Sequence, residues 1–214
     1  LATVVDEPEL KARHLALGAT TADPATLEML DEAARSASAR GAPAAAAELL
    51  DIAIRHDPDG APQRRIRAAR YHLAAGDARA ARELLEPTVE ALPEGPLRAK
   101  ALAQWAAVHL FDDNFLEAAA LLQRALSEAG DNPARRAQIS TALAFALFNG
   151  GHIEAAVACV EQAESFAEAA GFPLLGCQAL TMRVHLHFMR GDGLDENALQ
   201  RAMMLESESG HVPA

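Results

Sequence analysis

Five short turns recur along the chain at nearly even spacing, and they constrain its fold more than any other feature. They centre on Gly41, Gly76, Asp113, Gly151 and Gly191, which are 35, 37, 38 and 40 residues apart. Internal periods of roughly this length are typical of arrays in which each unit is a pair of helices. Each turn is therefore predicted to join the first helix of a pair to the second.

The residues on either side of these turns are in register. A small residue stands seven positions before each turn, at Ala34, Ala69, Ala106, Ala144 and Val184. Alanine stands five positions after the first four turns, at Ala46, Ala81, Ala118 and Ala156, and Glu196 has that place in the fifth. A larger aliphatic residue follows nine positions after the first four turns, at Leu50, Leu85, Leu122 and Val160. Small residues let two helices approach closely while larger ones pack between them, so the pattern is tetratricopeptide-like.

Prolines, glycines and capping residues set the limits of the helices. Asp23 followed by Pro24 is a typical helix start. Pro87 falls inside a predicted helix and should kink it or end it early. We predict helix pairs at 25–40 with 43–56, 62–75 with 78–91, 96–111 with 115–129, 133–149 with 153–170, and 174–190 with 195–208. The expected fold is all-α, a tetratricopeptide-like right-handed superhelix of about five antiparallel helix pairs, because no single pair can bury its apolar face alone.

The predicted organisation is one helical repeat domain after a short junction. Residues 1–23 are interpreted as a junction from a preceding domain and 24–214 as the helical repeat domain. The expected repeats are 24–58, 61–93, 96–131, 133–171 and 173–210. Because the chain begins with Leu1 and its last predicted helix ends near Gly210, we interpret it as a piece of a longer protein.

Composition and charge restrict the possible partners. The formal net charge of −11 disfavours nucleic-acid binding by this chain. Arg64, Arg65, Arg67 and Arg70 form a local exception on one predicted helix, interpreted as a solvated face rather than a dock for an acidic partner. No apolar run is long enough to cross a membrane and no signal peptide is evident, so we expect no membrane contact and a cytoplasmic location. The two cysteines, Cys159 and Cys177, are expected to be small buried hydrophobic residues.

No arrangement of residues predicts catalysis or a metal site. His72, His109 and His187 share one repeat position, four before the turn, where Ala37 and Leu147 stand in the other units. A position that accepts such different residues is interpreted as a packing site between helices. Phosphate-binding loops, zinc-protease motifs and nucleophile motifs are absent, and acidic pairs such as Glu206 and Glu208 are interpreted as aids to solubility. We expect no enzyme activity, no cofactor and no metal in this chain.

The first helices of the last two pairs predict a binding groove. In a tetratricopeptide-like superhelix these helices line the concave surface. They carry aromatic side chains beside amides and hydroxyls that could orient a ligand, with Phe111 nearby. The alternative is that these aromatic side chains only fill the inner wall or a dimer contact. The predicted groove residues are Gln138, Thr141, Phe145, Phe148 and Asn149, then Gln178, Thr181, His185, Phe188 and Met189.

The last predicted helix lacks a following unit to cover its apolar residues. These residues are Leu199, Ala202, Met203 and Leu205. Repeat arrays normally need a polar cap at their ends. We therefore predict a homodimer through this end.

Residues 13–34, RHLALGATTADPATLEMLDEAA, and 39–50, ARGAPAAAAELL, resemble the large ATP-binding LuxR-type transcription regulators that are related to the maltose regulator. The similarity covers roughly the first 55 residues, where such regulators pass from their ATPase module to their helical repeats. The resemblance implies a parent protein with an N-terminal ATPase and a C-terminal DNA-binding helix-turn-helix, neither of which lies in this chain. No ATP-binding, DNA-binding or inducer-binding residue can be carried over.

Two functions fit these observations. The first is a sensor and protein-interaction arm of a bacterial LuxR-type regulator, which binds an inducer small molecule, a regulatory protein or a peptide and relays this to DNA-binding activity in signal transduction. The alternative is a generic tetratricopeptide-like protein-binding scaffold unrelated to transcription. Sequence outside this chain would separate the two.

Overall fold

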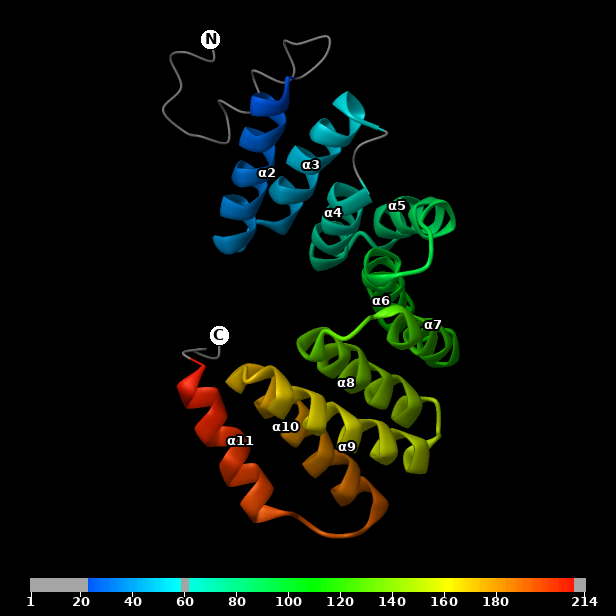
Figure 1. Cartoon of the computed structure of the whole chain (residues 1–214), viewed down its shortest axis with the longest axis vertical. Coiled ribbons are helices and arrows are strands. Elements are labelled where there is room, and N and C mark those ends of the chain that lie inside the picture. The colour runs from blue at the N-terminus through cyan, green and yellow to red at the C-terminus, as the bar shows by residue number, and fades with distance from the viewer. Residues whose placement is uncertain (1–22, 59–61, 210–214) are drawn as a thin grey trace. The chain divides into compact units, whose positions relative to one another are not determined.

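The structure is a computed structural model that describes residues 23–58 and 62–209. These residues form ten α-helices and no strand (Figure 1). Every predicted helix is present, and its ends lie within one residue of those expected from the sequence. The helices are α2 (Pro24–Ala39), α3 (Pro43–His56), α4 (Pro62–Ala74), α5 (Ala78–Ala91), α6 (Pro96–Phe111), α7 (Phe115–Glu128), α8 (Pro133–Asn149), α9 (Ile153–Ala170), α10 (Pro173–Arg190) and α11 (Glu196–Glu208).

Each of the five predicted turns ends a helix with one residue in the left-handed backbone region. The φ angles run from 56° at Asp113 to 97° at Gly191. In every turn the N–H of the next residue donates to the carbonyl four residues before the turn, as Ala42 does to Ala37 at 3.0 Å. This is the Schellman motif, in which a left-handed residue reverses the chain and satisfies the last carbonyls of the helix. The sequence period follows from the repetition of this motif.

Helix starts and the internal proline follow local chemistry. The Asp23 carboxylate accepts a hydrogen bond from the Thr26 N–H at 2.7 Å, and Pro24 is the first residue of α2, which confirms the predicted cap. Helix α5 continues past Pro87 to Ala91, so the expected early end is wrong. No helix in the described ranges combines the length and apolar character needed to cross a membrane.

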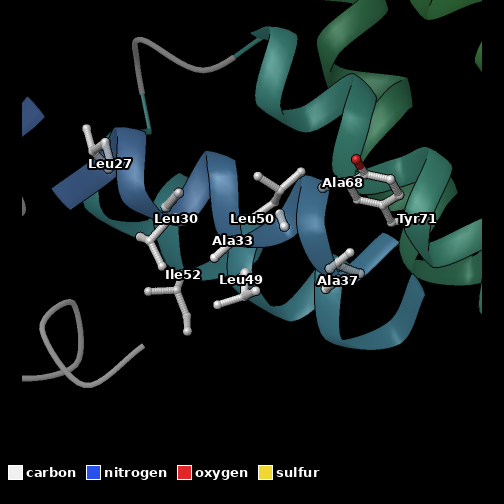
Figure 2. Packing of buried hydrophobic residues seen from close by; sticks show 13 residues of the cluster. Leu27, Leu30, Ala33, Ala37, Leu49, Leu50, Ile52, Ala68 and Tyr71 are labelled. Atoms are coloured by element: carbon white, nitrogen blue, oxygen red, sulfur yellow. The ribbon is translucent and has the colours of Figure 1, made fainter. Parts of the chain in front are cut away.

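Helices α2 to α5 belong to one compact unit, which ends at Pro93. Figure 2 shows its core, where Leu30 of α2 and Leu50 of α3 pack together and α4 adds Ala68 and Tyr71. Leu30 and Leu50 are completely buried. Two side chains of this size stabilise the unit by about 1.5–3 kcal/mol each.

The arginines of α4 hold this first unit together. Arg64 donates to Asp31 of α2 at 3.1 Å and to Asp57 at 2.9 Å, and Arg67 pairs with the same Asp31. Arg65 donates to the Pro58 carbonyl. The interpretation as a solvated face is therefore wrong for Arg64, Arg65 and Arg67, which bind the preceding helix pair, whereas Arg70 is exposed.

Helices α6 to α11 belong to a second compact unit. Consecutive helices pack against one another, and α10 also contacts α8. The small residues that precede each turn and the larger residues that follow the first four turns are all buried, in both units, as the register predicts.

The fifth repeat departs from the predicted register. The loop from Gly191 to Asp195 is longer than the other four turns, so Ala198 rather than Glu196 occupies the small buried position of α11. Glu196 lies instead in the exposed first turn of that helix. A fixed offset from the turn fails wherever the loop changes length.

Candidate binding groove

A groove of about 760 Å³ lies on the second unit, between α8, α10 and the end of α11. Helix α10 contacts α8 as well as the intervening helix α9, because consecutive helix pairs stack. This volume falls in the range of ligand-binding clefts, roughly 300–1,000 Å³. The groove is lined by Gln138, Thr141, Ala142 and Phe145 of α8, by Leu174, Cys177, Gln178, Thr181, Met182 and His185 of α10, and by Glu206 of α11.

The two helices present matching side chains to this groove. Gln138 and Gln178, then Thr141 and Thr181, then Phe145 and His185, occupy the same places before the turns at Gly151 and Gly191. Spacings of three and four residues place an amide, a hydroxyl and a ring along one face of each helix. The repeat therefore builds two parallel rows of the same chemistry.

Several polar groups of the groove are available to a ligand. Within residues 23–58 and 62–209, the amides of Gln138 and Gln178 and the carboxylate of Glu206 have no hydrogen-bond or ion-pair partner. Thr141 is different, because its hydroxyl donates to the Ala137 carbonyl at 2.9 Å. A primary amide both donates and accepts hydrogen bonds, so each free glutamine can serve either kind of polar group.

The aromatic rings at the groove each pack against a second ring. Phe145 is 44% exposed, and its ring meets that of Phe115 edge to face, with centroids 6.3 Å apart. Phe148 makes a similar contact with His185 at 5.1 Å. Each ring at the groove is thus positioned by a second ring from a neighbouring helix.

Six of the ten predicted groove residues line this groove, three from each helix. The others lie elsewhere. Phe148 packs into the core between α8, α9 and α10, and the Asn149 amide donates to the Phe145 carbonyl of its own helix at 2.9 Å. Phe188 and Met189 are exposed near the end of α10 and do not line the groove.

The sequence missed five lining residues, for two reasons. Ala142, Leu174, Cys177 and Met182 lie beside the predicted face of α8 or α10, and the groove is wider than that face. Glu206 comes from α11 and is half-buried, although it was interpreted as an exposed solubilising residue. Its position in the groove depends on how α11 packs against α10. The residue pattern of α8 and α10 does not predict that packing.

The repeated histidines are half-buried, as expected of packing residues, and each also makes a polar contact. His187 Nδ1 lies 2.9 Å from an Asp192 oxygen, and His109 Nδ1 lies 3.3 Å from the Asn114 amide, each across the turn that ends its helix. His72 Nε2 contacts Asp51 at 3.0 Å. These side chains are half-buried and polar-bonded. No three His, Cys, Asp or Glu side chains in the described part of the chain are placed to hold a metal.

Both cysteines are half-buried free thiols rather than fully buried residues. Cys159 packs against the core that contains Val157 and Val160, and burial raises the pKa of its thiol. Cys177 lines the groove. A raised thiol pKa lowers the thiolate fraction, so Cys159 is a poor nucleophile.

Comparisons with known proteins identify the fold. No family model and no curated protein matches the sequence. BtubC from P. vanneervenii has a similar structure, with a TM-score of 0.75 and 19% identity over 100% of this chain and 92% of that one. A kinesin light chain of Podospora anserina with TPR-like repeats gives 0.69 and 20%, over 87% and 97% of the two chains. MamA from Desulfovibrio magneticus RS-1 gives 0.62 and 16%, over 86% and 97%.

These similarities confirm the predicted fold class, an all-α repeat of the tetratricopeptide-like kind. At such low identities they show the fold alone. They do not support the resemblance of residues 13–34 and 39–50 to LuxR-type regulators, and residues 1–22 lie outside the described residues.

Proposed function

We propose that this chain is a protein-interaction module that binds a peptide segment of a partner protein in the groove of α8, α10 and α11. The observation that carries the proposal is the pair of matching rows, in which free glutamine amides stand beside an exposed, supported aromatic ring. A peptide backbone offers N–H and C=O groups in alternation, and glutamine amides can satisfy both. The apolar side chains of Phe145, Leu174 and Met182 would hold the apolar residues of the peptide.

The regulator hypothesis is a narrower form of this proposal. In it the same groove belongs to the sensor arm of a LuxR-type regulator, and its ligand is an inducer or a regulatory protein. Only the resemblance of residues 13–34 and 39–50 favours this form, whereas the scaffold form needs nothing beyond the fold and the groove. A gene that encodes an ATPase before this segment and a helix-turn-helix after it would support the narrower form.

The proposal is tested by selecting random peptides displayed on phage against the full chain. Kd values of the enriched peptides are then measured by fluorescence polarisation. Gln178→Ala and Phe145→Ala should each weaken binding by about tenfold, because each removes a group that contacts the peptide. Circular dichroism shows whether the variants keep their helices.

Matched controls come from equivalent residues away from the groove. Gln162→Ala removes an exposed glutamine of α9, and Phe172→Ala removes an exposed phenylalanine before α10. Both should bind within about twofold of the wild type. If no peptide is enriched, or if the groove variants bind as well as these controls, the proposed function is wrong.

A further inference from the structure

Helices α9 and α11 carry the same pattern of residues, displaced by 42 positions. The matched pairs are Ala156 with Ala198, Val157 with Leu199, Val160 with Ala202, Ala163 with Leu205, and Glu164 with Glu206. The alanines and Val160 of this set are buried, and Leu205 is half-buried against α10. The two helices therefore sit in their repeats in the same orientation.

In α9 the second and last residues of this pattern are Val157 and Glu164. Both are covered by the following helix, α10. Val157 is 5% exposed and belongs to a cluster with Leu186 of α10. The Nε atom of Arg183, also on α10, lies 2.9 Å from the Glu164 carboxylate. Burial raises the pKa of Glu164, and the charge of Arg183 opposes this rise. Helix α10 thus brings both an apolar side chain and a cation to α9.

In α11 no following helix packs on these two positions in the described part of the chain, although Glu206 is half-buried at the groove. Leu199 is 37% exposed and Met203, one turn further on, is 60% exposed. Glu206 has no ion-pair partner among the described residues. Arg201, which points to the other side of the helix, contacts Glu168 of α9 at 3.8 Å. We call the surface of Leu199, Met203 and Glu206 the open face of α11.

We propose that the open face of α11 binds an α-helix of a partner protein that carries an arginine and, three residues later, an aliphatic residue. This is the spacing of Arg183 and Leu186, which cover the equivalent face of α9. The arginine pairs with Glu206, and the aliphatic residue covers Leu199. The inference rests on one part of the proposed function, that this chain is a protein-interaction module, and it names the partner class for a second surface that adjoins the groove at Glu206.

Charge favours a basic partner over a second copy of this chain. Helix α11 and its cap contain Asp195, Glu196, Glu206 and Glu208, so two antiparallel copies would bring carboxylates together at both ends. Like charges that face each other across an interface oppose association. The net charge of −11 adds to this repulsion and attracts a cationic helix instead.

The test uses a labelled synthetic peptide with the sequence of residues 173–190, in which Cys177 is replaced by serine, and the full chain as receptor. We expect saturable binding by fluorescence polarisation. Glu206→Arg in the receptor should weaken binding by about tenfold or more. A peptide with Arg183→Glu should bind the wild type weakly and regain affinity for the Glu206→Arg receptor, because the charges are exchanged.

Several results would overturn the inference. One is a peptide that does not bind, or that binds Glu206→Arg as well as wild type. Another is a dimer in sedimentation velocity that Met203→Glu disperses, because the face would then belong to a second copy.

The groove variant Gln178→Ala separates this inference from the proposed function. It should leave binding of the 173–190 peptide within about twofold of the wild type. The phage selection could enrich no peptide while the Arg183→Glu peptide still regains affinity for the Glu206→Arg receptor. In that case the proposed groove function is wrong, and helix binding by the open face is supported.

Discussion

The two units of the molecule share one repeat pattern in their cores and differ in what they expose. All the large hydrophobic side chains that are strongly exposed in the described residues belong to the second unit, from Phe111 of α6 to Met204 of α11. Interhelical ion pairs occur in both units, as between Arg64 and Asp31 in the first and between Arg183 and Glu164 in the second. The buried and the exposed residues are therefore set by different positions of the same repeat, and among the described residues only the second unit exposes large hydrophobic side chains strongly.

The largest expected effect comes from equivalent core leucines in the two units. Leu50→Ala and Leu122→Ala each empty a buried site nine positions after a turn, and each should cost about 3 kcal/mol of unfolding free energy in urea. Only Leu122→Ala should also weaken the phage-selected peptides, because α7 supports α8 and its groove residues. Equal loss of peptide binding in both variants would show that peptide binding does not depend on the second unit alone.

The ion pairs of the first unit give the next largest effect. Asp31→Ala leaves two part-buried arginines of α4 without this carboxylate and should cost about 2 kcal/mol of unfolding free energy. Glu32→Ala is the control, since its pair with Arg35 is largely exposed and should contribute under about 0.5 kcal/mol. Equal stabilities of these two variants in urea would contradict the role assigned to Asp31.

Much of the fold could be predicted because the left-handed turn residue is encoded locally. A glycine at that site, with alanines at fixed distances on both sides, specifies a helix end and a close helix crossing together. The polar contacts of His109 and His187 could have been predicted, since each histidine is followed five residues later by Asn114 or Asp192 across the turn. That pairing marks a polar contact at the helix end.

Only the groove residues that lie on the repeated face of α8 or α10 could be predicted from the sequence. The equivalence of Thr141 with Thr181 follows from the repeat, so the sequence identified both rows. Glu206 could not be identified, because its place depends on α11 packing against α10 after a loop of altered length. When the length of a loop determines how two helices pack, their contacts cannot be predicted from the repeat period of the sequence.

The turns give the smallest effect. Asp113 has φ 56° and is the only non-glycine residue with positive φ in the described residues. Asp113→Gly should raise the unfolding free energy by about 0.5 kcal/mol, since a side chain in this region is strained. Gly76→Asp, at the equivalent turn of the first unit, should lower it by about 1 kcal/mol. If both variants shift the urea midpoint in the same direction, backbone strain does not govern these turns.

NMR chemical-shift mapping on the full chain tests whether peptide binding belongs to the second unit. A phage-selected peptide is titrated into the labelled protein, and the backbone amides that move are assigned. We expect the largest shifts on α8 and α10 around Thr141 and Thr181, and on the end of α11 near Glu206. Largest shifts on α2 to α5, with α8 and α10 unchanged, would contradict this expectation.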